Sequence, residues 1–202
     1  MTIQSLLASH ALVTPVDVAL TLLASAAVII AWYRERGLGS SLTARKGRGM
    51  RFAVIWARWF LGAHALFSGP NYFLHLYPQA QMVHPLAGPL QHYMEAVGLF
   101  GVIKAIESIV GVCLILDVYV PAAAMLEMPV TFTIFYLSVF VVADPRTLWT
   151  GPRELILNAF ILAAYGGWFA DILRPRLSPR PLWSQWPGAP AAGSSTPHRA
   201  TE

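Results

Sequence analysis

The sequence predicts an all-α polytopic membrane protein. Of its 202 residues, 56% are hydrophobic and only 12% are charged, and the mean hydropathy is +0.54. A soluble domain carries about 25% charged residues. Several apolar runs also approach the ~20 residues that a helix needs to cross a bilayer. We therefore expect five transmembrane helices.

Polar and proline-rich stretches divide the chain into segments. The expected organisation is an N-terminal extension (1–14), an extra transmembrane helix (15–33), a basic cytoplasmic loop (34–51), a four-helix membrane domain (52–173) and a Pro-rich disordered tail (174–202). The single cysteine, Cys113, excludes a disulfide within this chain and any CxxC redox pair.

The first span has a well-marked start. Thr14 can cap a helix, Pro15 suits its first position, and Asp17 is favoured near the positive end of the helix dipole. We expect this helix to end at a membrane interface beside Trp32 and Tyr33, because aromatic side chains concentrate there.

Basic residues predict the orientation. The segments 34–51 and 174–202 hold ten of the 14 Lys and Arg residues, and positive charge concentrates in cytoplasmic loops. We therefore expect a multi-pass membrane protein, with the N-terminus outside and the C-terminus in the cytoplasm. Since these residues flank apolar spans, they favour a topology signal over a nucleic-acid surface.

Glycine and proline mark the ends of the other four spans. Gly69-Pro70 is expected to end or kink the second span, and 117–120 to form a tight turn. The predicted spans are 52–68, 92–116 as one helix, 121–142 and 152–173.

Charged side chains inside these spans define the candidate site. Arg58, Lys104, Glu107 and Glu127 come from three spans, and a rise of about 1.5 Å per residue places them at depths of roughly 10–20 Å from the cytoplasmic ends. Ionisable groups in a bilayer are paired or functional, so we expect the four to meet in the bundle interior. They could handle a quinone or protons, or only fix helix register, and Arg58 could instead reach outward to the interface.

The third span carries the most informative spacing. Lys104 and Glu107 are three residues apart and project from one helical face. Gly98 and Gly101 lie on roughly the same face, where small residues let another helix approach closely. We therefore expect this helix to face the bundle interior.

Other polar residues have weaker expectations. His64 and Asn158 are candidate contacts of a bound cofactor, although a packed histidine and an interhelical hydrogen bond are the simpler interpretations. Glu95 and Glu154 are expected near helix N-termini, where a carboxylate is stabilised by the dipole.

The sequence contains no recognisable metal-binding or cofactor-binding motif. The histidines of the loop after the second span are irregularly spaced, so we predict no metal site. The chain contains no GxGxxG or CxxCH motif. We therefore expect no intrinsic cofactor, and any electrons delivered to a bound quinone would come from a partner protein.

Three spans also carry a family resemblance. Arg58, Gly62 and Gly69 follow an Arg-x3-Gly-x6-Gly pattern. Lys104, Glu107 and Gly111 follow a Lys-x2-Glu-x3-Gly pattern in the next span. The span after it starts with Pro-Ala-Ala at Pro121 and has an inner proline, Pro129. With these, residues about 52–170 resemble the DoxX/DoxD-like family of small bacterial integral membrane proteins.

The resemblance implies a four-helix transmembrane core, here preceded by one additional N-terminal transmembrane helix, with a redox setting in the bacterial inner membrane. Members of that family have been linked to the small subunit of thiosulfate:quinone oxidoreductase, to redox-stress membrane complexes and to the maturation of periplasmic enzymes. The sequence departs from the family at two places. Many members have a Lys after the second glycine, where this chain has Asn71-Tyr72. Many have a His late in the third core helix, where this chain has Phe135-Tyr136-Leu137.

Three functional hypotheses follow. The first is a membrane subunit of a quinone-linked redox complex, in which the buried Arg/Lys/Glu cluster handles quinone or protons. The alternative is a non-catalytic membrane anchor, assembly or structural subunit of a larger complex. The third is a small transporter or proton channel, although no inverted repeat is visible. The expected partners are the lipid bilayer and other membrane proteins, and not nucleic acid.

Overall fold

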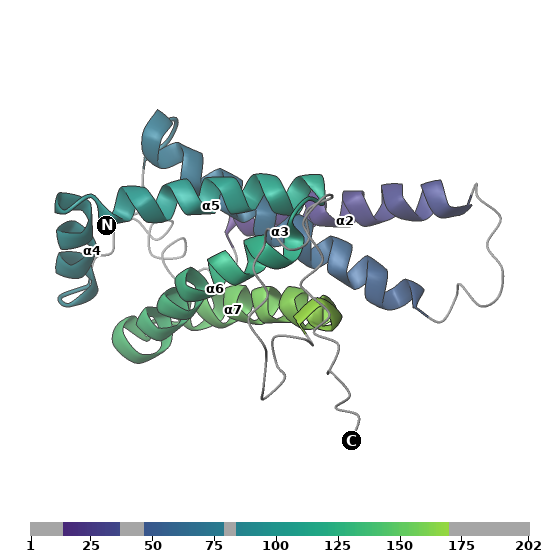
Figure 1. Ribbon diagram of the computed structural model, residues 1–202. Coiled ribbons are helices and arrows are strands. Elements are labelled where there is room, and N and C mark those ends of the chain that lie inside the picture. The colour runs from purple at the N-terminus through teal and green to yellow at the C-terminus, as the bar shows by residue number, and fades with distance from the viewer. Residues whose placement is uncertain (1–13, 37–46, 79–83, 170–202) are drawn as a thin grey trace, which may run out of the picture. The chain divides into compact units, whose positions relative to one another are not determined.

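The computed structural model describes residues 14–36, 47–78 and 84–169, and this part of the chain is helical (Figure 1). The elements are α2 (Pro15–Arg36), α3 (Arg48–Leu74), α4 (Ala87–Ala96), α5 (Leu99–Leu116), α6 (Val120–Tyr136), the π-helix η2 (Leu137–Val142), α7 (Thr147–Ala164) and the 3₁₀-helix η3 (Gly166–Phe169). The expected N-terminal extension, most of the basic loop and the Pro-rich tail lie outside the described residues.

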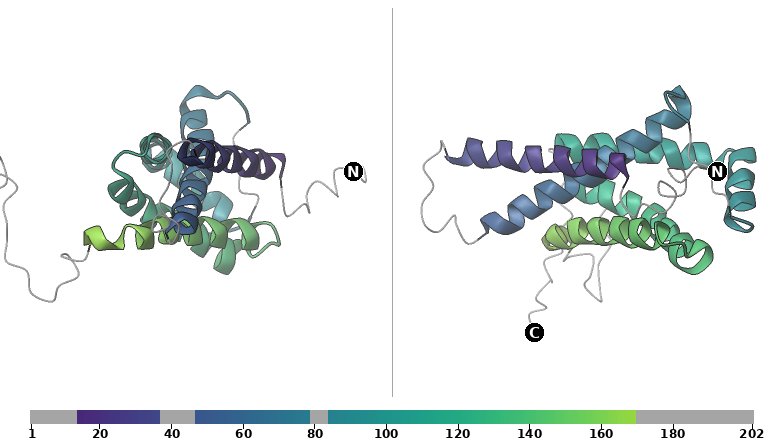
Figure 2. Two further views of the ribbon diagram at one scale, coloured as in Figure 1. Left: turned by 90° about the vertical axis from the view of Figure 1, so that its right-hand side faces the viewer. Right: turned by 180° about the vertical axis from the view of Figure 1, so that it is seen from behind.

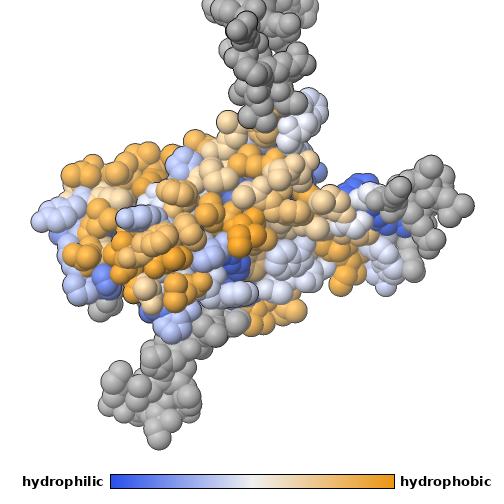
Figure 3. Space-filling model, turned by 90° about the horizontal axis from the view of Figure 1, so that it is seen from below, coloured by the Kyte–Doolittle hydropathy of each residue, from blue (hydrophilic) through white to orange (hydrophobic). Residues whose placement is uncertain are grey.

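Three of the described helices are long and apolar enough to cross a membrane. They cover Pro15–Glu35, Leu99–Leu116 and Val120–Val142. Large apolar side chains remain exposed on them, and apolar residues cover much of the face in Figure 3. Leu22 of α2 is 65% exposed and Ile109 of α5 is 59% exposed. Such a surface is compatible with contact with lipid.

α2 and α3 pack as an antiparallel pair (Figure 2). Their interface contains a core of Leu20, Ala24, Phe60 and Ala63, and the indole of Trp56 donates to Ser25 Oγ at 3.4 Å. A second core joins α3, α5, α6 and α7. Its buried members are Ala57, Leu61, Val110, Leu114, Val120, Ala123, Ala124 and Ile161.

Glycines bring α3 and α5 close together. A Cβ placed on Gly69 would lie 2.5 Å from Ser108 Oγ and 2.7 Å from the Lys104 carbonyl oxygen. A Cβ on Gly111 would lie 2.9 Å from the Gly62 carbonyl oxygen. No side chain fits at these separations, so the two backbones approach each other only because these positions are glycine.

The third predicted span is two helices, which corrects the expectation of one helix over 92–116. The chain breaks at Gly98, whose φ of 77° is favourable only for glycine, and α4 turns away from the direction of α5 (Figure 1). A Cβ on Gly98 would meet nothing within 4 Å, so this glycine makes a bend and not the expected helix contact. Gly101 does lie at a contact, because a Cβ placed on it would lie 3.3 Å from the Tyr72 ring.

The second span is longer than expected. α3 continues through Pro70 to Leu74, so Gly69-Pro70 does not end it. The Asn71 side chain ties the following segment back to the helix, because it donates to the Tyr77 carbonyl and accepts from the Tyr77 N–H, both at 3.0 Å. The Tyr77 ring also stacks on Phe67, with 4.3 Å between the ring centroids.

The turn between α5 and α6 is confirmed. Asp117 and Tyr119 both have left-handed backbone conformations with φ of 61° and 50°, and α6 begins at Val120.

The last span begins earlier than expected. α7 starts at Thr147 because Asp144 Oδ1 accepts the backbone N–H groups of Arg146 and Thr147, at 2.9 and 3.1 Å. Pro152 therefore lies inside α7 and does not start it. The α-helix ends at Ala164, before the expected end at 173.

Candidate functional site

Lys104 and Glu107 form a closed ion pair on α5, as their spacing predicted. Lys104 Nζ donates to both carboxylate oxygens of Glu107, at 2.9 and 2.7 Å, and to Ser68 Oγ of α3 at 2.7 Å. The ammonium also lies 5.2 Å from the centre of the Phe100 ring. Both residues are buried, so this pair ties α5 to α3 with its charges satisfied.

Arg58 does not join these residues, contrary to the expectation of one four-residue cluster. Its Nε donates to the Leu114 carbonyl at 3.1 Å, and its Nη1 pairs with the Asp117 carboxylate. Arg58 is ten residues from Ser68 on α3, which separates the two levels by about 15 Å along the helix. Arg58 therefore caps the C-terminal end of α5.

Glu127 on α6 is buried without a cation partner. It is 3% exposed, and its Oε2 atom has no hydrogen-bond partner among the described residues. It lies within electrostatic range of Glu107, Glu154 and Lys104. Three of the four predicted residues thus gather in one region, together with a carboxylate that the sequence did not place there.

Asn158 of α7 lies against Glu127. Its Nδ2 donates to the Ala124 carbonyl at 3.1 Å and to Thr131 Oγ1 at 3.2 Å. Ala124 and Thr131 lie about one turn before and after Glu127 on α6, so the amide lies across the position of that glutamate. Asn158 is fully buried, and its Oδ1 atom has no partner among the residues described. The predicted interhelical role of Asn158 is confirmed.

A second polar group connects α2, α3 and α7. Arg153 Nη1 lies 2.7 Å from Asp17 Oδ1, and its Nη2 lies 3.6 Å from Glu154 Oε1. The same Glu154 oxygen lies 3.5 Å from Nδ1 of His64. The guanidinium of Arg153 also covers the Phe60 ring, 4.9 Å from its centre. His64 therefore lies beside a carboxylate from another helix.

The sequence pattern predicted capping for two members of this second group. Asp17 and Glu154 were expected to interact with helix dipoles, and His64 was a candidate cofactor contact or a packed histidine. One available signal was the spacing of Glu154 and Asn158, which places both side chains on one face of α7. That face also carries the contact with α6.

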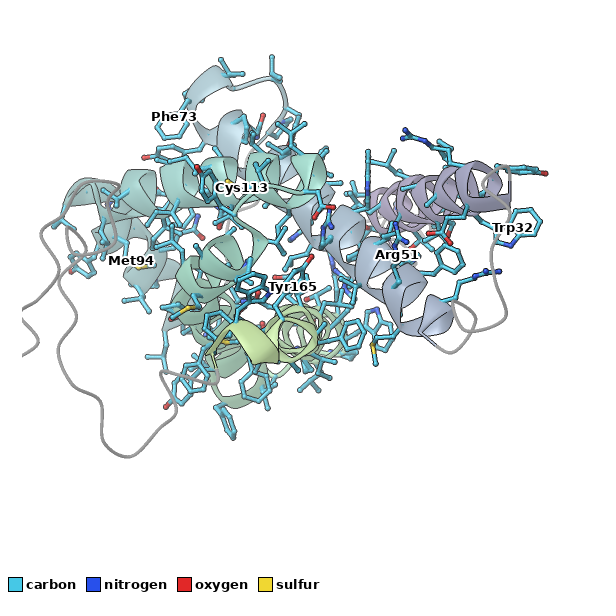
Figure 4. All side chains as sticks on the ribbon, turned by 45° about the vertical axis from the view of Figure 1, so that its right-hand side comes forward. Trp32, Arg51, Phe73, Met94, Cys113 and Tyr165 are labelled. Carbon is cyan, nitrogen blue, oxygen red and sulfur yellow. The ribbon has the colours of Figure 1, made fainter. Side chains whose placement is uncertain are left out.

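The ends of the helices carry other charges. Glu35 pairs with Arg51 at 2.8 Å at the end of the α2–α3 pair, where Figure 4 shows Arg51 and Trp32. Within the described ranges, no group of three or more His, Cys, Asp or Glu residues is placed to hold a metal ion.

Comparisons of the chain with protein-family models, with curated proteins and with solved structures gave no match. The resemblance to the DoxX/DoxD-like family therefore stays a prediction, and the geometry of the site carries the functional argument.

Proposed function

We propose that this chain is an integral membrane subunit of a quinone-linked redox complex, and that Glu127 binds and releases a proton there. The observation that carries the proposal is the burial of Glu127 without a partner for Oε2. Buried polar groups are almost always hydrogen-bonded, so an unpartnered carboxylate oxygen indicates a group with another role.

One bound proton would satisfy both unpartnered acceptors. A protonated Glu127 has an O–H donor, and Asn158 presents a free acceptor oxygen at the same interface of α6 and α7. The Lys104–Glu107 pair is already neutral, so it does not compensate a charge on Glu127. A carboxyl group in such a place favours the neutral acid, and it ionises only when the proton has an acceptor.

Helix packing supports a four-helix core around this carboxyl group. α3 packs on α5, α5 on α6, α6 on α7, and α7 on α3, which closes a ring. α2 packs on α3 as the additional helix. Reduction of a quinone takes up protons with its electrons, so a proton-binding group inside the core suits that reaction. The electrons come from a partner in the bacterial inner membrane, since the sequence has no cofactor motif.

The first experiment measures the proton itself. Infrared spectra of the purified protein in lipid are recorded in H₂O and D₂O. We expect the band of a protonated carboxylic acid that shifts in D₂O and is lost in Glu127→Gln. Glu95→Gln is the matched control, because Glu95 lies in α4 and accepts from Gln91 at 3.0 Å. A spectrum that Glu127→Gln leaves unchanged contradicts the proposal.

The second experiment tests the redox setting. We expect Glu127→Gln to lower quinone-dependent reduction by membranes at least tenfold, with the protein and its copurifying partners present at normal levels. Glu107→Gln is measured beside it. If both variants support normal quinone reduction while the complex assembles, the catalytic form of the proposal is wrong.

A non-catalytic anchor or assembly subunit is the second candidate. The closed ion pairs of Lys104 and Arg58 and the glycine contacts between α3 and α5 favour it, because such features hold helices together without chemistry. This function predicts that the same substitutions remove partners from the detergent-extracted complex. Copurification in mild detergent separates the two candidates.

A further inference from the structure

The polar group around Glu154 lies next to the Glu127–Asn158 pair. Glu154 and Asn158 are four residues apart on α7, so their side chains share one face at a spacing of about 6 Å along the axis. Asp17 is the third residue of α2, and Glu154 is the eighth of α7. The group therefore extends from Glu127 and Asn158 toward the N-terminal ends of α2 and α7.

His64 lies at the exposed edge of this group. The His64 side chain is 30% exposed, whereas that of Glu154 is 6% exposed, and 3.5 Å separates Nδ1 from Oε1. The imidazole is thus partly exposed on α3 and lies beside a buried carboxylate. Histidine is the side chain whose ordinary proton affinity lies nearest neutral pH, so it exchanges protons with its surroundings readily.

We propose that His64 and Glu154 form the route by which protons reach Glu127, an inference that rests on the proposed function. His64 accepts a proton from water that reaches its exposed edge, and the proton on Nδ1 passes to Glu154 Oε1 as the N–H bond breaks and an O–H bond forms. The proton then passes to Glu127 Oε2, through water wherever the two carboxyl groups are apart. No electrons move in these steps, and the reverse sequence returns the proton.

Arg153 acts as a positioning residue on this route. Its short bond to Asp17 holds the guanidinium toward α2, and its contact with Glu154 is longer, at 3.6 Å. The Glu154 carboxylate is thereby held near His64. The other charges facing the route are Glu107 and Lys104, which face Glu127 and neutralise each other.

The experiment follows the infrared band of Glu127 after a rapid change of pH, with the full chain in lipid vesicles. We expect His64→Gln and Glu154→Gln each to slow protonation of Glu127 at least tenfold, with the same final amplitude. Added imidazole should restore the rate in His64→Ala, and a purely structural role for His64 would not give this rescue. His92→Gln is the matched control, because His92 is exposed on α4.

Each outcome decides the inference. Wild-type rates in both His64→Gln and Glu154→Gln overturn the route and leave Glu127 as a proton-binding group. If the wild-type protein shows no infrared band of a protonated Glu127, the proposed function and the route are both overturned. If one variant fails to fold, Arg153→Lys provides a further measurement. Because Lys lacks the forked geometry that contacts Asp17 and Glu154 together, we expect slower protonation, and an unchanged rate contradicts the positioning role.

Discussion

Two buried glutamates on neighbouring helices have opposite surroundings. Glu107 is 5% exposed and Glu127 is 3% exposed. Both oxygens of Glu107 accept from Lys104, whereas Oε2 of Glu127 has no partner within the described part of the chain. Burial is the same, so the difference lies in the partner. A paired carboxylate fixes a helix, and an unpaired one is available for protons.

The largest effect should come from breaking the pair. We expect Lys104→Met to lower the free energy of unfolding by about 3–5 kcal/mol, because it leaves Glu107 charged and alone in the interior. Reversible unfolding in mixed micelles measures this loss. The double variant Lys104→Met/Glu107→Met should recover most of it, and equal loss in the single and double variants would falsify the ion-pair explanation.

The glycine contact beside the pair gives the next effect. A Cβ on Gly69 lies 2.5 Å from Ser108 Oγ and 2.7 Å from the Lys104 carbonyl oxygen, so Gly69→Ala must push α3 away from α5. We expect a loss of about 1–3 kcal/mol in the same unfolding measurement. Gly49→Ala is the control on the same helix, because its Cβ meets nothing within 4 Å. Equal stability of the two variants would show that the contact is not tight.

The carboxylate of Asp144, in the turn before α7, can be compared with those of Glu107 and Glu127. Burial raises the pKa of Asp144, but hydrogen bonds from the Thr147 N–H and hydroxyl and from the Arg146 N–H, with the charge of Arg146, hold that pKa below its ordinary value. The carboxylate therefore stabilises the folded state at neutral pH, and this contribution is lost as the pH falls through the lowered pKa.

Asp144→Ala should accordingly cost about 1 kcal/mol at neutral pH, because the start of α7 loses a cap. The difference in stability between Asp144→Ala and the wild type should shrink as the pH is lowered below the ordinary carboxyl pKa. Thermal unfolding across that pH range measures it. A difference that stays constant with pH means that the carboxylate does not act through its charge.

If Glu127 is the neutral acid of the proposed function, Glu127→Gln should change stability least, by less than about 1 kcal/mol, because the amide can still donate to Asn158 Oδ1. Glu107→Gln, which loses a charged partner of Lys104, should cost more in the same assay. If Glu127→Gln destabilises the protein as much as Glu107→Gln, then Glu127 is charged and paired, and the contrast between the two residues disappears.

The sequence predicted those features that depend on local spacing. Apolar runs indicated helices that can cross a membrane, and the i, i+3 spacing indicated the Lys104–Glu107 pair. Arg58 was predicted to join the Lys104–Glu107–Glu127 cluster, but it binds groups at the C-terminal end of α5. The Leu114 carbonyl and the left-handed Asp117 become its partners only once that helix has ended. An apolar run in the sequence does not show which carbonyl and carboxylate groups become available where the helix ends.

Errors in helix boundaries account for the rest. The region around Gly98 is apolar on both sides, so composition gave no sign of the break between α4 and α5. Starting the last helix at Pro152 made Glu154 a first-turn residue. With the start at Thr147, Glu154 is the eighth residue and faces His64. A shift of five residues thus changed its interpretation from a cap to a member of the site.

The bond between Asp17 and Arg153 sets an order on biogenesis. The two residues are 136 positions apart in the chain. At 5–20 residues per second, a ribosome needs on the order of ten seconds to add Arg153 after Asp17 has been made. During that interval Asp17 has its hydrogen bonds from Thr14 but lacks its arginine partner, so the bond between α2 and α7 forms only after α7 has been made.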